Sequence, residues 1–278
     1  MIALTLPYPA IDPVAFSVGA ISIKWYGLAY SAGLIIAWLT IRRLLQTPWL
    51  WPGERAPFRA DVADNLVLYV IIGAVVGGRL GQVLLYELDF YATNPGEILR
   101  VWKGGMSFHG ALMGSAAAII YFARQSGISA LTSMDLCCAG MPLGLIIGRL
   151  ANFVNSEHWG RASDVPWAMV FPNGGPLPRH PSQLYEAALE GVVMYIIIRL
   201  ATHWYGALKR PGLVAGIWLV WYAIARMICE MFRQPELDHW LNIGPFTAGQ
   251  IYCIPMLLLG VAFVVAANKS ALGDHARP

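Results

Sequence analysis

The sequence predicts an all-α integral membrane protein with about seven transmembrane helices, and two properties of the chain support this prediction. Of the 278 residues, 57% are apolar and only 13% are charged, whereas about 25% of residues are charged in an ordinary soluble domain. The charged residues are also unevenly distributed, so that long stretches contain none. About 20 apolar residues in a helix are enough to cross the roughly 30 Å hydrocarbon core of a bilayer.

Three charge-free stretches and four interrupted ones are the predicted spans. The charge-free stretches are residues 25–41, 104–123 and 239–268. The four interrupted stretches are residues 66–86, 136–153, 184–200 and 213–232. Charged residues within these four include Arg79, Arg149, Glu186, Glu190, Arg226 and Glu230. A charged residue within a span costs at least about 2.5–3.5 kcal/mol at mid-bilayer, and less near an interface.

The distribution of Lys and Arg predicts the orientation of the chain. The first 23 residues contain neither, which argues against a secretory signal peptide. Four arginines lie in the loop 42–64, three basic residues lie near 199–211, and others follow in the tail 269–278. Basic loops stay in the cytoplasm, so we expect the N-terminus outside and the C-terminus inside.

The segment 155–181 is too polar to cross the membrane and is rich in Pro and Gly. We expect it to form a small cap on the outer face. No linker between soluble domains is visible, so residues 1–278 are expected to form one membrane domain.

Composition also argues against several classes of protein. High hydrophobicity argues against disorder, and four cysteines are too few for a disulfide scaffold. A net charge of +3 without a long basic run argues against nucleic-acid binding. No Cys or His pair has metal-ligand spacing and no nucleotide-type glycine motif occurs, so neither a metal nor a cofactor is expected.

Glycines recur at every fourth position in three predicted spans. They are Gly73, Gly77 and Gly81, then Gly110 and Gly114, and finally Gly140, Gly144 and Gly148. This spacing places small residues on one helix face, where helices approach closely. The pattern predicts that the spans 66–86, 104–123 and 136–153 pack into one tight core.

The most polar segment of the chain begins at the end of the span 136–153. It contains Arg149, Asn152, Asn155, Glu157, His158 and Arg161. A guanidinium group binds a phosphate through two parallel donors, so this segment favours an anionic head group as ligand. Arg79, Arg149 and Arg226 lie near the outer ends of their spans, with Glu157 and Glu230 nearby in the sequence. Either they share a polar cavity or each extends separately to the membrane surface.

His109 lies in a charge-free span, near its expected outer end. If it faces an arginine-rich cavity, it is a candidate base or ligand anchor. Packing or a satisfied hydrogen bond would explain a single histidine equally well.

Residues 148–160 match the pattern Gly-Arg-x-(Gly or Ala)-Asn-Phe-x-Asn-x-Glu-x-x-Gly at every specified position. This pattern is the signature of the prolipoprotein diacylglyceryl transferases, which the chain resembles over almost its whole length. Further similar segments surround Tyr26, Arg79, His109, Glu186 and Arg226. Ala111 stands where the family usually has a glycine, which implies only a packing adjustment.

The resemblance implies an enzyme of the bacterial inner membrane that works on the outer, periplasmic side. Its partners would be membrane lipid, namely phosphatidylglycerol, and a prolipoprotein signal peptide with a lipobox cysteine. The diacylglyceryl group would move to the cysteine thiol, forming a thioether and releasing glycerol phosphate. This would be the first step of lipoprotein maturation.

The resemblance also implies roles for individual residues. Arg149 and Arg226 would hold the lipid phosphate, and His109 would either deprotonate the thiol or only position it. The residues expected to bind substrate are Tyr26, Arg149, Asn152, Asn155, Glu157, Gly160, Arg226, Glu230 and Arg233. Glu186 and Tyr185 are expected to contact these residues and not the substrate itself.

Two other classes of protein remain open on the residues alone. A secondary transporter for an anionic solute also contains intramembrane arginines and glycine-rich helices. A seven-span receptor or scaffold would share the hydropathy, but it would not need so many polar groups at one helix end.

Overall fold

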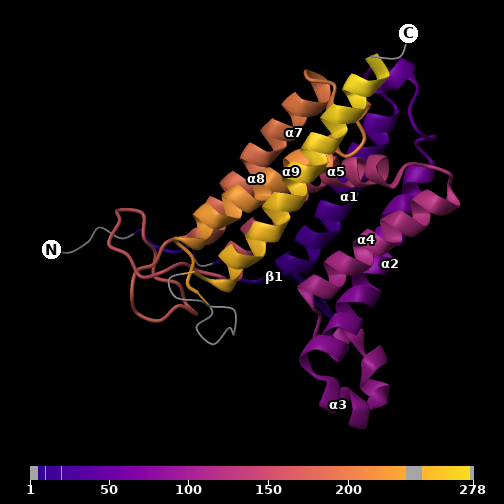
Figure 1. Cartoon of the computed structure of the whole chain (residues 1–278). Coiled ribbons are helices and arrows are strands. Elements are labelled where there is room, and N and C mark those ends of the chain that lie inside the picture. Colours follow the sequence, from indigo (N-terminus) through magenta and orange to yellow (C-terminus); the bar gives the residue numbers. More distant parts are fainter. Residues whose placement is uncertain (1–5, 10, 20, 236–245, 276–278) are drawn as a thin grey trace. The chain divides into compact units, whose positions relative to one another are not determined.

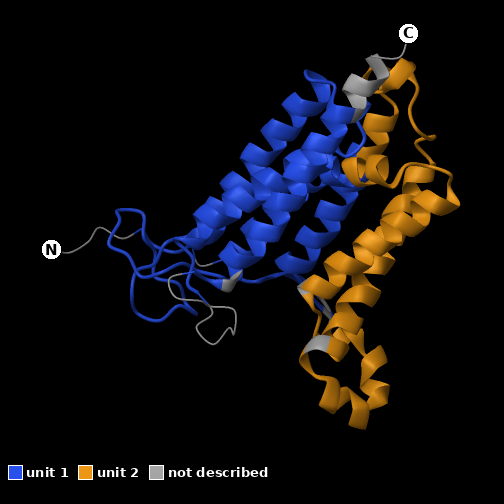
Figure 2. Cartoon of the chain, in the orientation of Figure 1, with its two compact units in different colours: residues 1–40, 137–278 blue, residues 41–136 orange. Residues whose placement is uncertain are grey.

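The computed structural model describes residues 6–9, 11–19, 21–235 and 246–275, most of which are helical (Figure 1). The chain divides into two compact units (Figure 2). Unit 1 consists of residues 1–40 and 137–278, and unit 2 of residues 41–136. The single membrane domain expected from the sequence stays a prediction.

Unit 1 begins with a short hairpin and continues in long helices. The hairpin strands are β1 (Val14–Val18) and β2 (Ile21–Lys24), which pair antiparallel. The helices are α1 (Trp25–Leu45), α5 (Ala130–Val154), α6 (Ser182–Glu186), α7 (Met194–His203), α8 (Leu213–Glu230) and α9 (Ala248–His275). The first residues of α5 and the last residues of α1 belong to unit 2.

Unit 2 is built on two long helices, α2 (Val62–Gly81) and α4 (Phe108–Gln125). A short helix, α3 (Leu88–Thr93), lies between them in the sequence. A π-helical segment, Gln82–Tyr86, continues α2, and single 3-10 turns occupy Pro48–Leu50, Pro52–Glu54, Pro95–Leu99 and Val101–Lys103.

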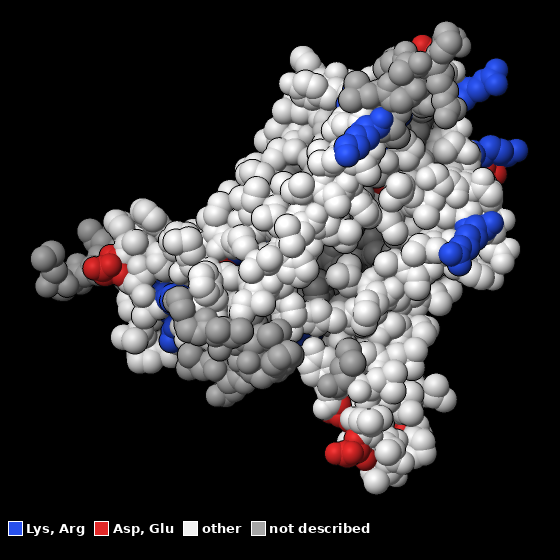
Figure 3. Space-filling model, in the orientation of Figure 1, with Lys and Arg blue, Asp and Glu red and all other residues white. Residues whose placement is uncertain are grey.

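Within the described part of the chain, five helical segments are long and apolar enough to cross a membrane. They are Trp25–Leu45, Val62–Leu84, Ala130–Val154, Leu213–Glu230 and Gly249–Lys269. The chain is therefore a mostly helical protein with the helices of a multi-pass membrane protein. On the face shown in Figure 3, the long sides of α7, α8 and α9 carry no visible charge, and charged groups lie toward the ends of these helices.

The other two predicted spans, residues 104–123 and 184–200, are also helical. The first starts later than predicted, and the second contains a π-helical segment. α4 begins at Phe108 instead of near residue 104, because Gly104 and Gly105 adopt positive φ angles and Ser107 caps the helix by accepting a hydrogen bond from the Gly110 amide. The helix from residue 182 to 203 contains a π-helical segment at Ala187–Val193, between α6 and α7.

The structure differs from the sequence expectations at the first strands and at the start of the last helix. The hairpin β1–β2 was not predicted, although residues 16–18 and 21–24 alternate apolar and polar side chains on either side of Gly19, which has a positive φ. The helix α9 begins at Ala248, later than the predicted residue 239. Residues 236–245, and the end of the predicted tail at 276–278, lie outside the described residues.

The glycine stripes bring helices together, but not as one core. In unit 2, a Cβ at Gly73, Gly77 or Gly81 would overlap atoms of Gly110, Gly114 or their neighbours on α4. The glycines of α5 instead approach α1 in unit 1: Gly140 lies against Ala37, and Gly144 against Gly33. The prediction of one core from three spans is therefore wrong in its pairing. Spacing reveals which face is small, but not which helix lies against it.

The segment 155–181 contains no long helix or strand and is held by isolated backbone pairs. Met169 and Arg179 exchange both backbone hydrogen bonds, and the Gly160 amide donates to the carbonyl of His180. The Arg161 amide donates to the carbonyl of Phe232, which follows α8. These bonds connect residues 155–181 to the end of α8.

Candidate active site

Six charged side chains meet among the helices of unit 1, and we call them the arginine–glutamate cluster. They are Arg149, Glu186, Glu190, Arg226, Glu230 and Arg233. The three guanidinium groups and three carboxylates balance formally. Since a charge at membrane depth is tolerated when it is paired, this arrangement explains how so many charges occupy one region of an apolar bundle.

The spacing of the residues along their helices directs them to one place. Glu186 and Glu190 are four residues apart, and so are Arg226 and Glu230 on α8, so each pair shares a helix face. The π-helical segment begins directly after Glu186 and contains Glu190. Single π-helical turns are common at functional sites because they redirect side chains within a helix.

Glu186 is the centre of the cluster. One of its oxygens lies 2.9 Å from the Nη1 atoms of both Arg226 and Arg233. The other lies 3.0 Å from Nη1 of Arg149. One fully buried carboxylate thus contacts arginines from α5, from α8 and from the residues after α8.

Glu190 contacts Arg149, and Glu230 contacts Arg226. Glu190 accepts hydrogen bonds from Nε and Nη2 of Arg149 at 3.1 and 2.8 Å. Glu230 lies 2.9 Å from Nη2 of Arg226 and accepts a 3.1 Å hydrogen bond from the Thr247 hydroxyl. A Cβ at Gly249 would lie only 2.7 Å from the Glu230 carboxyl carbon, so a larger residue here would displace the Glu230 carboxylate.

Burial differs between the two kinds of charge. The side chains of Glu186 and Glu190 are 0% exposed, whereas those of Arg149 and Arg226 are 17% and 16% exposed. The carboxylates of Glu186 and Glu190 are therefore inaccessible to a ligand. The guanidinium groups of the two arginines keep some exposed surface on which a ligand can bind. An arginine has five N–H donors and cannot lose its charge, so the arrangement is suited to an anion.

The signature segment lies beside this cluster in unit 1. Buried Asn152 donates a 3.3 Å hydrogen bond to the carboxylate of Glu157, which is exposed. The Oδ1 atom of Asn155 is buried and has no hydrogen-bond partner among the described residues. These side chains supply an amide and a carboxylate at the end of α5.

Gly160 has a packing function that its position in the signature did not reveal. A Cβ there would lie 2.5 Å from the carbonyl oxygen of Phe232 and 2.7 Å from His180. Gly160 also forms an isolated antiparallel bridge with Arg233. Only glycine permits this approach, which brings the signature segment to the backbone of Arg233.

Tyr26, near the start of α1, belongs to the same unit. Its hydroxyl lies 2.9 Å from that of Tyr30. The Tyr26 side chain is near enough to Glu157 and Arg149 to interact with their charges. All nine residues predicted to bind substrate lie in unit 1. Arg149, Arg226 and Arg233 each contact Glu186, and Glu230 contacts Arg226.

His109 and Arg79 lie in unit 2. His109 stands in the first turn of α4, and its Nδ1 atom is 3.4 Å from the hydroxyl of Tyr86. Arg79 is only 5% exposed and donates to the backbone carbonyls of Glu97, Ile98, Gly104 and Gly105. A cavity shared by Arg79, Arg149 and Arg226 was one of two predicted arrangements. The guanidinium group of Arg79 is held instead by main-chain oxygens of unit 2.

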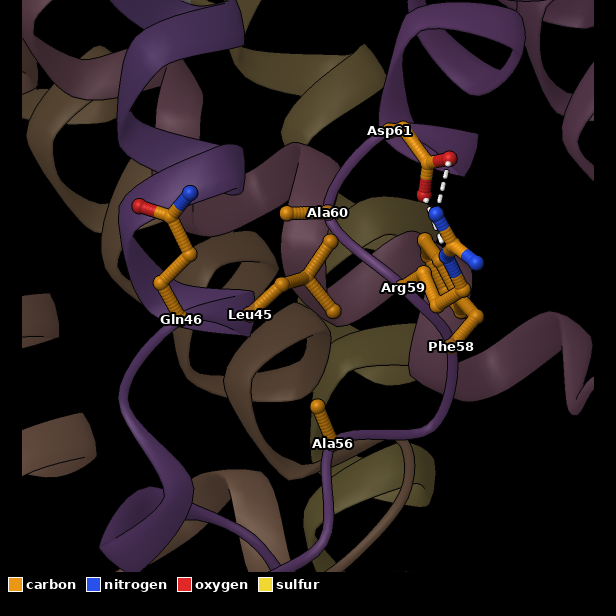
Figure 4. A pocket seen from close by; sticks show the side chains of 7 residues that line it. All are labelled: Leu45, Gln46, Ala56, Phe58, Arg59, Ala60 and Asp61. Carbon is orange, nitrogen blue, oxygen red and sulfur yellow. Dashed lines mark hydrogen bonds and ion pairs between the residues drawn. The ribbon is translucent and has the colours of Figure 1, made fainter.

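A shallow pocket of about 590 Å³ lies in unit 2, on the loop after α1 (Figure 4). It is lined by Leu45, Gln46, Ala56, Phe58, Arg59, Ala60 and Asp61. Arg59 and Asp61 pair with each other at 3.1 Å, and this neighbouring arginine lowers the pKa of Asp61. None of the predicted site residues lines this pocket. The described residues contain no group of three or more His, Cys, Asp or Glu arranged to hold a metal ion.

Sequence reasoning underestimated the glutamates. Glu186 was expected only to support the site, and Glu190 was noted only as a charge within a span. The available signal was their spacing of four residues in an otherwise apolar helix, which places two acids on one buried face. Two buried acids require cationic partners, and the intramembrane arginines were the available ones.

Comparison with known proteins identifies the family of the chain. Residues 13–266 match a sequence model described as prolipoprotein diacylglyceryl transferase. A phosphatidylglycerol–prolipoprotein diacylglyceryl transferase of Nitrobacter winogradskyi is 50% identical over 266 residues, covering 95% of this chain and 91% of the relative. Proteins of the same name are 47% identical in Rhodopseudomonas palustris, covering 97% and 94%, and 46% identical in Agrobacterium fabrum, covering 95% of each. The chain therefore belongs to the prolipoprotein diacylglyceryl transferase family.

Proposed function

We propose that this chain transfers the diacylglyceryl group of phosphatidylglycerol to the thiol of the lipobox cysteine of prolipoproteins. The observation that carries the proposal is the arginine–glutamate cluster in a chain of this family. Its carboxylates are buried, and its arginines keep part of their surface exposed. This combination holds guanidinium groups ready for a lipid phosphate.

Arg149 and Arg226 bind the phosphate of the donor lipid. Arg149 uses Nε, Nη1 and Nη2 toward Glu186 and Glu190, and these three contacts leave two of its five N–H groups for a ligand. Held by carboxylates, the guanidinium groups are preorganised. They stabilise the negative charge that grows on the phosphate as the lipid reacts.

The reaction is a displacement at carbon. The cysteine sulfur attacks the glycerol carbon that carries the phosphate, a C–S bond forms, and the C–O bond breaks. The phosphate oxygen keeps the bonding electrons, and glycerol phosphate leaves. A free cysteine with a pKa near 8.5 is only a few per cent thiolate at neutral pH, so deprotonation needs assistance.

His109 is the candidate base for the thiol. Such general-base assistance typically contributes about 10²–10⁴-fold to a rate. A thiolate stabilised by arginine, with His109 only positioning the peptide, is the other form of this proposal. The two forms differ in the pH dependence of transfer, which follows the histidine only when the histidine takes the proton.

The remaining signature residues shape the head-group site. Tyr26, Asn152, Asn155 and Glu157 supply hydroxyl, amide and carboxylate groups around the lipid head group. Gly160 acts through its lack of a side chain, which lets the signature segment approach Arg233. Glu230 and Arg233 hold the arginine–glutamate cluster together.

The membrane topology of the proposal follows the charge distribution. α4 and the helix of residues 182–203 cross the membrane together with the five apolar helical segments named above, which gives seven spans. The loop 42–64 and the tail lie in the cytoplasm, and the cap 155–181 lies on the outer side. The active site then faces the periplasm at the bacterial inner membrane, where the signal peptide of an exported prolipoprotein arrives.

The proposal is tested with the purified full chain in nanodiscs that contain phosphatidylglycerol labelled in its diacylglyceryl part. A lipobox peptide with cysteine is compared with the same peptide carrying serine in its place. We expect label on the cysteine peptide only, with the mass of one diacylglyceryl group. A folded preparation that labels neither peptide would overturn the proposal. Uptake of an anionic solute by proteoliposomes would then support the transporter, which family membership disfavours.

A further inference from the structure

His158 lies at a position that the family signature leaves unspecified, yet it is closely held. Its φ of 56° lies in the left-handed region, which is uncommon for residues other than glycine, although histidine adopts it more often than most. The carbonyl of His158 accepts a 2.8 Å hydrogen bond from the hydroxyl of Ser182. The neighbouring carbonyl of Glu157 accepts a 2.6 Å bond from the Gln183 amide.

The ring of His158 is held by an arginine. Its Nδ1 atom lies 2.9 Å from Nη2 of Arg233, which also contacts Glu186 through Nη1. Arginine only donates hydrogen bonds, so Nδ1 of His158 must accept. The proton of the neutral ring therefore sits on Nε2, and the bond to Arg233 determines the tautomer.

Partial burial and the charge of Arg233 disfavour protonation of the ring. The groups near enough to interact with it are Arg233, Arg149, Glu186 and Glu157. Partial desolvation, followed by the positive charge of Arg233, lowers the pKa of His158 below its usual value. A protonated ring would also lose the acceptor that Arg233 uses.

These facts limit what His158 can do. The lone pair on Nδ1 is already engaged, so His158 is not suited to act as a base unless the bond to Arg233 breaks. What it presents is an N–H donor of fixed tautomer on an exposed side chain, beside the arginine–glutamate cluster. A donor near Arg149 complements the oxygen atoms of a phosphate.

We propose that His158 is a head-group-binding residue whose Nε2–H donates a hydrogen bond to a phosphate oxygen of the donor lipid. This inference rests on the proposed function and adds to it a contact that the signature does not specify. In this role Arg233 acts as a positioning residue, because it selects the tautomer of His158 and orients its ring.

Three substitutions separate donation to the lipid from the holding of Arg233. In His158→Asn, the side-chain oxygen can replace Nδ1 toward Arg233, but the donor at Nε2 is lost. In His158→Gln, the side-chain amide reaches the place of Nε2 and restores a donor. His158→Leu removes both groups. The exposed cap residue Asp164, changed to Asn, controls for perturbation of the segment.

The measurements are transfer kinetics and equilibrium binding of labelled phosphatidylglycerol in mixed micelles. We expect H158N and H158L to raise both KM and Kd for the lipid by about tenfold, with kcat little changed, because one hydrogen bond to a charged acceptor is lost. H158Q restores most of the affinity, and D164N behaves as the wild type. An H158N variant with wild-type affinity, or an H158Q variant as weak as H158L, overturns the proposal.

A second readout does not depend on activity. Nitrogen-15 spectra of histidine-labelled protein, assigned by difference from H158N, show whether Nδ1 or Nε2 carries the proton. We expect the Nε2–H tautomer at pH 7, and its loss in Arg233→Gln. A proton on Nδ1 overturns the inference. A wild-type chain that binds the lipid without transferring label contradicts the proposed function, while the binding comparison still decides the role of His158.

Discussion

Arg79 and Arg149 each follow a glycine and precede a leucine near the C-terminal end of a helix, yet their guanidinium groups are held in different ways. Arg79 in unit 2 donates four hydrogen bonds to backbone carbonyls and stacks over Tyr91 at 5.0 Å. Arg149 in unit 1 contacts the carboxylates of Glu186 and Glu190. Arg79 uses four of its five N–H groups in these hydrogen bonds. Arg149 uses three of its five toward the two carboxylates.

The partners of each arginine determine what it can do. Main-chain oxygens cannot move away without unfolding the turns at Glu97–Gly105, so Arg79 serves to hold those turns on the end of α2. Carboxylates are anions, as a phosphate is, and their attraction holds the guanidinium in a geometry suited to binding an anion. The same three residues, Gly-Arg-Leu, thus support a structural arginine in one unit and a candidate catalytic one in the other.

The largest expected effect is on the transfer rate, when Arg149 and Arg79 are substituted in turn. Arg149→Ala should lower transfer from phosphatidylglycerol by about 10²–10³-fold, the usual cost of losing one preorganised group that stabilises developing charge. Arg79→Lys should lower the melting temperature but leave the transfer rate of the folded protein within a few-fold. Both rates are measured by label transfer to the cysteine peptide, normalised to folded protein. A folded R149A variant with near-normal transfer would show that Arg149 does not bind the phosphate.

The second prediction compares the two buried glutamates within unit 1. Glu186→Gln should destabilise the protein by about 1.5–3 kcal/mol, the value of a hydrogen bond to a charged group, because Glu186 contacts three arginines. Glu190→Gln should cost less, since Glu190 hydrogen-bonds to Arg149 and has only a longer ion pair, 3.7 Å, with Arg226. Thermal unfolding in detergent measures both variants. Equal losses would mean that the number of arginine contacts does not set the stability of the cluster.

The smallest expected effect concerns the glycine stripes that accompany each arginine. Gly77→Ala should cost about 1–3 kcal/mol, because its Cβ would overlap the carbonyl of Gly110 and push α2 from α4. Gly148→Ala should be neutral or slightly stabilising, because nothing lies within 4 Å of that Cβ and alanine favours helix. Melting temperatures compare the two, and a stable G77A variant would show that the two helices can separate at little cost.

Much of the fold was predictable from hydropathy. The charge-free and interrupted stretches correspond to helices, because an apolar stretch of this length has few alternatives in a membrane. The exceptions have local causes: Gly104 and Gly105 delay the start of α4, and the π-helical segment interrupts the helix of residues 182–203. The hairpin β1–β2 was missed because short strands alternate too few residues to stand out beside long apolar helices.

The site was predictable where a single segment carries it. The signature 148–160 and similar short segments predicted Arg149, Arg226 and Arg233, which the structure brings together at Glu186. Their binding of substrate stays a prediction. The central role of Glu186 and Glu190 was not predicted, because a charge in an apolar stretch does not reveal its partner. His158 was named among the polar residues of the segment but given no role of its own, because its contact with Arg233 joins residues 75 positions apart in the sequence.

The sequence by itself determined that the chain is a helical membrane protein of this transferase family, because length, hydropathy and the signature are local properties. Only the tertiary structure decided which charges meet. Arg226 and Glu186 are 40 residues apart and Arg149 and Glu190 are 41 apart, yet each pair comes within 3 Å. The energy of such a pair depends on its distance and on the polarity around it, and helix packing sets both. Packing therefore made one arginine a structural support and left another partly exposed for a ligand.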